Sequence, residues 1–216
     1  MKILLKKLLY NIFFKNFSIK YNYMLEPIQL SQFISEISRT SNIEGSIVEV
    51  GAFRGLTTCF ALEHMKNEKI NKTYYAIDTF EGFLSTDIDY EVYNRKKNIN
   101  FLKKSFKINS EKIFKKNFLN YSNLITIKND CSLFDFKKIN PIAVCLLDVD
   151  LYSPTKNTLY KVYDNLIEGG IILVDDCIKN ENFDGAFLAY KEFVNEIGVD
   201  EQYIGNKCGV IKKNKK

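Results

Sequence analysis

The fold of this chain is decided by the stretch VEVGAFRG, residues 48–55. An apolar run of strand length, residues 46–50, overlaps its start, and a helix-like pattern follows at residues 57–66. Gly51 and Gly55 therefore bracket a turn between a strand and a helix, where the missing side chains let a ligand approach the backbone. The turn departs from GxGxxG, so the fingerprint of dinucleotide-binding domains is absent.

Apolar runs of strand length recur along the chain and alternate with helix-like stretches. The predicted strands are residues 46–50, 73–77, 124–128, 143–147, 170–174, 202–205 and 208–212. The predicted helices that follow the glycine turn are residues 57–66, 97–117, 155–166 and 185–197. Buried runs that alternate with helices indicate βαβ units and a parallel sheet covered on both faces. We therefore expect an α/β fold, a doubly wound, mostly parallel Rossmann-like sheet of about seven strands with helices on both faces.

Composition is typical of a globular protein of one domain. Of 216 residues, 46% are hydrophobic and 14% aromatic, enough for a large core. The net charge of +5 has a local source, because residues 1–25 contain five lysines and no acid. The remainder shows no basic stripe with interleaved aromatics, so we expect no nucleic-acid partner. The five cysteines have no CxxC or zinc-like spacing, which indicates reduced thiols and a cytoplasmic location.

Residues 1–26 are predicted to be a basic amphipathic helical appendage to a main domain at residues 27–216, which begins with a second amphipathic helix at 27–39. Apolar side chains recur at helical spacing in the appendage: Leu4, Leu5, Leu8, Leu9, Ile12 and Phe13. A membrane-surface helix would suit this pattern. Packing on its own core or on a second subunit uses the same stripe and is favoured, so we expect a homo-oligomer, a dimer or higher. We expect neither a membrane-spanning segment nor a signal peptide.

Acidic residues lie at or just beyond the ends of all five central strand candidates. They are Glu49, Asp78, Asp130, the pair Asp148 and Asp150, and the pair Asp175 and Asp176. In an open parallel sheet, ligands bind in the crevice beyond the carboxyl ends of the strands. These acids are therefore expected to converge on one site.

Two kinds of ligand fit such a site. Asp78, at the end of the second strand, can accept both ribose hydroxyls of a nucleoside, which favours an adenosine-containing cofactor bound without a pyrophosphate. Asp148 and Asp150 stand two apart, so they would project on one side if strand geometry persisted. Crowded carboxylates without histidine suit Mg²⁺, or Mn²⁺ as a near neighbour. The alternative is that Asp150 and Asp176 cap following helices or turns.

His64, the single histidine, and Cys177 are interpreted as surface or packing residues. A histidine-based triad is therefore not expected. A general base should be a carboxylate or the metal-bound alkoxide itself.

Four runs in this order resemble the macrocin O-methyltransferase (TylF/MycF-type) family: VEVGAFRG at 48–55, DTFEGF at 78–83, LDVDLYSPT at 147–155 and GGIILVDD at 169–176. The resemblance covers roughly residues 30–212. It implies a class I methyltransferase fold, S-adenosylmethionine and Mg²⁺ as cofactors, and methyl transfer to a sugar hydroxyl. The implied acceptor is a small molecule or glycan, part of a natural product or a polysaccharide precursor.

The resemblance also implies site residues. The cofactor would be held by Glu49, Gly51, Ala52, Arg54, Gly55, Asp78 and Thr79, with Asp130 near the adenine. Asp148 or Asp150, together with Asp175 and Asp176, would ligate the metal. One member of the Asp148/Asp150 pair would take the hydroxyl proton, and the sequence leaves open which one. Residues 84–97 are expected to form a lid over the acceptor.

Three other functions are considered. A phenol or catechol O-methyltransferase has the same fold and a similar metal site. A phosphotransferase with an aspartyl nucleophile would need its DxD on the first strand, whereas here it follows the fourth. A non-catalytic S-adenosylmethionine-binding homologue would keep the fold, but all the candidate ligands remain present.

Overall fold

The computed structural model describes residues 2–13, 25–179 and 182–213, and its centre is one sheet with the strand order β3-β2-β1-β4-β5-β7-β6. Strands β1 to β5 are parallel, whereas β7 runs antiparallel to both β5 and β6. The strands are β1 (Ser46–Val50), β2 (Tyr74–Asp78), β3 (Leu124–Lys128), β4 (Ile142–Leu147), β5 (Leu166–Val174), β6 (Gln202–Ile204) and β7 (Cys208–Lys212). The predicted seven-stranded, mostly parallel sheet is confirmed.

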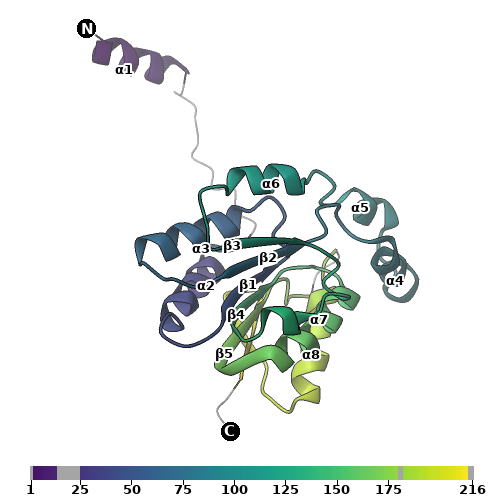
Figure 1. Ribbon diagram of the computed structural model, residues 1–216. Coiled ribbons are helices and arrows are strands. Elements are labelled where there is room, and N and C mark those ends of the chain that lie inside the picture. The colour runs from purple at the N-terminus through teal and green to yellow at the C-terminus, as the bar shows by residue number, and fades with distance from the viewer. Residues whose placement is uncertain (1, 14–24, 180–181, 214–216) are drawn as a thin grey trace.

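Helices cover both faces of this sheet (Figure 1). One face packs against α2 (Pro27–Arg39), α3 (Leu56–Asn67) and α6 (Glu111–Asn117), through a core that includes Phe33, Leu62 and Phe114. The other face packs against the 3₁₀ helix η1 (Phe136–Ile139), α7 (Tyr152–Asn165) and α8 (Gly185–Glu196), through Phe136, Leu159 and Phe193. Strands β1 and β4 are buried along their whole length. Burial on both faces explains why these strands are continuously apolar in the sequence.

The strand order places a crevice at the carboxyl ends of β1 and β4. The chain moves outward from β1 to β2 and β3, and then returns to β4 on the other side of β1. The loops after β1 and β4 therefore diverge to opposite faces of the sheet. This reversal is the switch point at which open α/β sheets bind ligands.

The predicted single helix at residues 97–117 is wrong, because the segment forms two helices, α5 (Ile99–Lys104) and α6. Asn98 begins α5 by accepting hydrogen bonds from the N–H groups of Asn100 and Phe101. Ser105 is extended and ends α5, and Ser110 then caps α6 by accepting from the N–H of Ile113. Polar side chains that satisfy free N–H groups at each start divide an otherwise continuous apolar pattern.

The segment expected to be a lid contains α4 (Ser85–Arg95), which is fixed to the body through the buried Glu91. One carboxylate oxygen of Glu91 accepts from the N–H of Tyr152, 2.7 Å away, and the other from Nε of Arg95, 2.8 Å away. Glu91 therefore accepts a hydrogen bond from the first turn of α7, and the N-cap residue of that helix is Leu151. The alternative in which Asp150 caps this helix is wrong.

Helix α1 (Lys2–Phe13) lies apart from the sheet and its covering helices (Figure 1). Among the described residues, no helix has the length and apolar character needed to cross a membrane. The division of the chain at residue 27 stays a prediction.

Candidate active site

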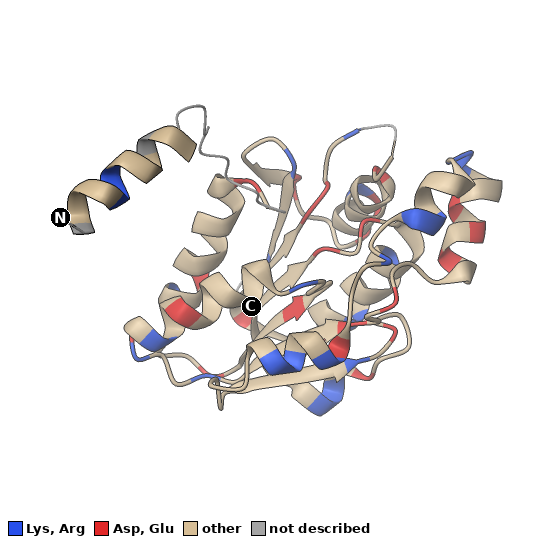
Figure 2. Cartoon of the chain, turned by 90° about the horizontal axis from the view of Figure 1, so that it is seen from above, with Lys and Arg blue, Asp and Glu red and all other residues tan. Residues whose placement is uncertain are grey.

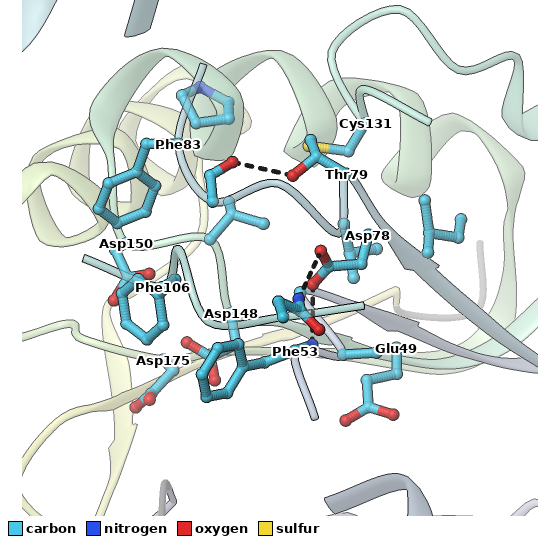
Figure 3. Close-up of a pocket in the computed structure, with 18 of the residues that line it drawn as sticks. Glu49, Phe53, Asp78, Thr79, Phe83, Phe106, Cys131, Asp148, Asp150 and Asp175 are labelled. Atoms are coloured by element: carbon cyan, nitrogen blue, oxygen red, sulfur yellow. Dashed lines mark hydrogen bonds between the residues drawn. The ribbon is translucent and has the colours of Figure 1, made fainter. Parts of the chain in front are cut away.

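A cavity of about 460 Å³ opens at the carboxyl ends of β1, β2, β4 and β5 (Figure 3). The loop after β1 and the lid segment form two of its walls, and the turns after β4 and β5 form another. It brings together all but one of the residues predicted for the site: Glu49, Gly51, Ala52, Arg54, Asp78, Thr79, Asp130, Asp148, Asp150, Asp175 and Asp176.

The two glycines of the first loop have different roles. Gly51 has a φ of +95°, and a Cβ added there would lie 1.8 Å from the carbonyl oxygen of Asp148. The backbones after β1 and β4 therefore touch, and only glycine fits between them. Gly55 is absent from the cavity lining and begins α3, where a Cβ would meet the rings of Phe114 and Phe118.

Asp78 is anchored at the end of β2 by backbone N–H groups. Its two carboxylate oxygens accept from Phe53, 2.8 Å away, and from Phe80, 2.5 Å away. Burial raises the pKa of Asp78, and these two hydrogen bonds oppose that shift. Oδ1 also accepts from Nδ2 of Asn109 over 3.4 Å, so Oδ2 keeps the further acceptor capacity toward the cavity. On the same side, Thr79 donates its hydroxyl to the carbonyl oxygen of Gly82, 2.8 Å away.

Arg54 and Asp130 occupy the edges of this part of the cavity. Arg54 is exposed, donates from Nε to the carbonyl oxygen of Ile108 over 2.9 Å, and holds its guanidinium 5.0 Å from the ring of Phe53. Asp130 accepts from the N–H of Ser132, 2.8 Å away, which fixes the turn after β3. Both side chains are positioned by contacts within the protein.

Glu49 is a buried carboxyl group beneath the glycine loop, with 2% of its surface exposed. Its Oε2 accepts hydrogen bonds from the hydroxyl of Tyr74, 2.7 Å away, and from the hydroxyl of Thr58. Burial raises the pKa of Glu49 to about 7, although both hydrogen bonds act in the opposite direction. Near neutral pH the Glu49 carboxyl group is therefore partly protonated.

We expect the ligand-free protein to lose stability as the pH rises from 4.5 to about 7. The pKa of Glu49 is about 7 in the fold against an ordinary value of 4.5, so the folded state binds one more proton than the unfolded state in this window. Once Glu49 is ionised in the folded state as well, the free energy of unfolding is lower by up to ~3 kcal/mol than it is below pH 4.5. Glu49→Gln keeps an acceptor for Thr58 and Tyr74 and should flatten the slope, measured by urea unfolding across this range. An equal slope in wild type and variant would contradict this account.

Four aspartates gather at the other side of the cavity. In Figure 3, Asp148, Asp150 and Asp175 lie on one side and Asp78 and Thr79 on the other. Asp150 and Asp175 are buried, and so is Asp176, whereas Asp148 is half-buried. Burial, followed by repulsion between neighbouring carboxylates, raises the pKa of Asp148, Asp150 and Asp175.

The four carboxylates differ in how they are compensated. Asp175 accepts from Nε2 of Gln29 over 2.6 Å and from Nζ of Lys207 over 2.9 Å. The same ammonium group lies 2.8 Å from Asp176. The Asp176 side chain is also hydrogen-bonded to that of Asp150. Among the described residues, none forms a hydrogen bond with the Asp148 carboxylate.

Two of these aspartates have strained backbones. Asp150 has a φ of +61° and Asp176 a φ of +56°. Both values lie in the left-handed region, which residues other than glycine adopt uncommonly. Such a conformation costs on the order of 1 kcal/mol per residue. The N–H of Ala186 donates to the carbonyl oxygen of Asp150 over 3.0 Å and helps to hold the turn. Strain of this kind is characteristic of functional sites.

Sequence reasoning missed Lys207 and the aromatic wall of the cavity. Lys207 lies in the turn between β6 and β7, and only the antiparallel pairing of β7 with β5 brings it to the aspartates. The aromatic wall is built by side chains from the glycine loop, the loop after β2, the segment between α5 and α6 and the segment before α8: Phe53, Phe83, Phe106 and Phe183. Ring centroids of Phe53 and Phe83 lie 5.2 and 5.3 Å from that of Phe106. No periodic pattern in the sequence signals these contacts.

Asp87 of α4 also lines the cavity. Burial, followed by repulsion from Asp130, raises its pKa to about 6. The sequence contains Asp87 within the expected lid, but nothing there indicates that it faces the cavity.

The remaining candidates lie elsewhere. His64 is hydrogen-bonded to the hydroxyl of Ser38 over 2.6 Å, outside the cavity lining, and Cys177 is buried in the core. In the part of the chain that the structure describes, no three acidic, histidine or cysteine side chains are arranged to hold a metal ion.

Comparison with known proteins identifies the family. The model of the macrocin-O-methyltransferase (TylF) family matches residues 27–212. Among curated proteins, demethyldecarbamoylnovobiocin O-methyltransferase from Streptomyces niveus is 27% identical over 144 residues, which is 63% of this chain and 54% of that protein. The chain thus aligns with about half the length of this relative.

Solved structures share the fold. The O-methyltransferase NovP matches with a TM-score of 0.72 and 19% identity, over 91% of this chain and 84% of that one. The calicheamicin methyltransferase CalS11 matches with a TM-score of 0.64 and 16% identity, over 87% and 80% of the two chains. The matched family model spans the sheet and all the residues of the cavity, so the chain belongs to the macrocin O-methyltransferase (TylF) family.

Proposed function

We propose that this protein is an S-adenosylmethionine-dependent O-methyltransferase that methylates a sugar hydroxyl of a natural product or a polysaccharide precursor. The proposal rests on one cavity with two sides. One side contains Asp78 and the glycine loop, which suit a nucleoside, and the other contains the four aspartates after β4 and β5. Family membership supports the reaction. One structural neighbour is described as a TDP-rhamnose 3'-O-methyltransferase, which supports a sugar as the acceptor.

The cofactor is proposed to bind along the ends of β1 and β2. Asp78 accepts the ribose hydroxyls, and the backbone at Gly51, which carries no side chain, lies against the cofactor. Asp130 lies toward the adenine, next to Asp87 of the lid. The aromatic wall excludes water from the reacting centre, which strengthens electrostatic interactions there.

Asp148 is proposed as the proton acceptor. Of the pair left open by the sequence, Asp150 is hydrogen-bonded to Asp176 and held in a strained turn, whereas the Asp148 carboxylate stays uncommitted and half-buried. Burial raises its pKa, which brings it closer to the range of an efficient general base. S-adenosylmethionine supplies an electrophilic methyl group. With the cofactor bound, Asp148 would take the proton of the sugar hydroxyl, so that the hydroxyl oxygen can accept the methyl group and S-adenosylhomocysteine is left.

A divalent cation, Mg²⁺ or Mn²⁺, is proposed to assist at the aspartates. Hard carboxylate oxygens suit these ions, and the Lys207 ammonium bound by Asp175 and Asp176 marks a position that already holds a cation. With Asp148 as the base, Asp150, Asp175 and Asp176 would hold the ion, which would lower the pKa of the acceptor hydroxyl. Lys207 would have to leave its two partners. Mn²⁺ binding followed by electron paramagnetic resonance tests this part, and an ion that stays free would remove the metal from the proposal.

Calorimetric titration with S-adenosylhomocysteine tests the proposed activity at its first step. We expect micromolar binding by the wild type, and binding weaker by about 100-fold or more for Asp78→Ala, because two hydrogen bonds to a charged acceptor are lost. Asp164→Ala, which removes an exposed acid on α7, is the matched control and should bind like the wild type. No binding by the wild type would refute the methyltransferase proposal.

The acceptor class is tested separately. Transfer of a labelled methyl group to TDP-rhamnose but not to catechol would support the sugar-directed reaction. Transfer to catechol alone would replace it with the phenol-directed alternative.

A further inference from the structure

Helix α1 presents an apolar face to solvent. Six large apolar side chains, in adjacent pairs that recur every four residues, have exposed fractions between 43% and 77%: Leu4, Leu5, Leu8, Leu9, Ile12 and Phe13. On a helix, residues three and four apart lie on one face. Figure 1 shows that the helix lies apart from the sheet and the helices that cover it. A contiguous apolar surface of this kind marks an interaction site.

Residues 1–25, which include α1 and its three lysines, carry the whole formal net charge of the protein. Residues 1–25 contain five lysines and no acid. Subtracting these five from the 31 basic residues leaves 26, which equals the 26 acidic residues of the chain, all of which lie beyond residue 25. The rest of the chain therefore has no formal net charge, and Figure 2 shows basic but no acidic positions on α1. Any partner attracted to this segment by charge must itself be anionic.

We propose that α1 binds the surface of an anionic lipid bilayer and lies in its plane. A helix of 12 residues is about 18 Å long, short of the roughly 30 Å hydrocarbon core, so it fits along the interface and not across it. Its apolar face enters the acyl boundary, and its lysines meet the anionic headgroups. The proposal stands apart from the proposed catalytic function, since α1 contributes no residue to the cavity.

A second copy of the chain is the competing occupant of this face, and charge disfavours it. The remainder of a second copy has no net charge and offers no overall attraction to the lysines. Contact between two α1 helices would bring like charges together, which lowers the stability of such a pair. An anionic lipid surface satisfies both the apolar face and the lysines at once.

Vesicle sedimentation of the full chain tests the proposal. We expect binding to vesicles of phosphatidylcholine with about one third phosphatidylglycerol, at least tenfold weaker binding to pure phosphatidylcholine, and loss of binding as salt is raised well above ~0.1 M. Lys6→Glu/Lys7→Glu and Leu5→Glu/Leu9→Glu should each reduce binding to the anionic vesicles by tenfold or more. Light scattering without lipid should give one mass for the wild type and for both variants.

Two control variants make the same changes on the body of the protein. Lys103→Glu/Lys104→Glu alters two exposed lysines of α5, and Leu119→Glu/Leu133→Glu alters two exposed leucines outside α1. Both should bind vesicles like the wild type. If the control variants lose vesicle binding as much as the two α1 variants do, the assignment of the binding surface to α1 is wrong. Absence of vesicle binding, together with a mass that falls in the Leu5→Glu/Leu9→Glu variant, would instead assign the face to a second copy.

Discussion

Replacing Asp148 with asparagine should lower the rate of methyl transfer by about 100-fold or more, because the substitution removes the proposed proton acceptor. The affinity for S-adenosylhomocysteine should change by less than about threefold, since asparagine keeps the shape of the side chain. Thermal unfolding at pH 8 should move to a higher temperature. Burial and repulsion from Asp175 raise the pKa of Asp148, so its ionised form destabilises the fold, and a neutral side chain relieves this cost.

Three measurements on the same variant separate this role from a purely structural one. The initial rate with a saturating acceptor should fall and the affinity for S-adenosylhomocysteine measured by calorimetry should stay nearly constant. The unfolding temperature should rise. Asp164→Asn serves as the control, because that aspartate is exposed on α7. A rate close to that of the wild type, or loss of rate and cofactor affinity in parallel, would remove Asp148 from its proposed role.

Gly51→Ala should weaken S-adenosylhomocysteine binding by about 100-fold or more, or prevent the domain from folding. A methyl group at this position would lie 1.8 Å from the carbonyl oxygen of Asp148, so the loops after β1 and β4 would have to separate. The backbone N–H of Gly51 bonds to the carbonyl oxygen of Ile77, and that of Asp148 bonds to the carbonyl oxygen of Val50, both over 2.8 Å. These bonds fix the crevice, and moving either loop displaces the proposed cofactor site.

Gly198→Ala isolates the effect of the close contact. Gly198 also has a positive φ, +70°, but a Cβ added there meets nothing within 4 Å. The control should therefore lose some stability from backbone strain and keep its affinity for S-adenosylhomocysteine. Circular dichroism and calorimetry on both variants measure the two effects. Equal affinities for Gly51→Ala and Gly198→Ala would mean that the contact with Asp148 does not shape the site.

The sequence predicted the sheet well because its parallel strands are buried on both faces. The bounds of β1 agree with its predicted range, since a strand covered on both sides is a short, continuous apolar run. The bounds of β3 and β7 also agree, although β3 is a partly exposed edge strand and β7 is antiparallel. The segment at residues 97–117 was predicted less well. There the apolar pattern continues while Asn98 and Ser110 begin separate helices, and side-chain capping of this kind outweighs periodicity.

Which acids meet could be predicted from the sequence, because the topology of a parallel sheet brings the carboxyl ends of its strands to one edge. The proposed division of roles between Asp148 and Asp150 rests on the tertiary structure and not on any local pattern. Strand alternation would place both on one side, but the left-handed backbone at Asp150 breaks that alternation, and its side chain is hydrogen-bonded to that of Asp176. Lys207 likewise reaches the aspartates only through the pairing of β7 with β5. Contacts between segments far apart in sequence leave no local pattern, so only the folded chain reveals them.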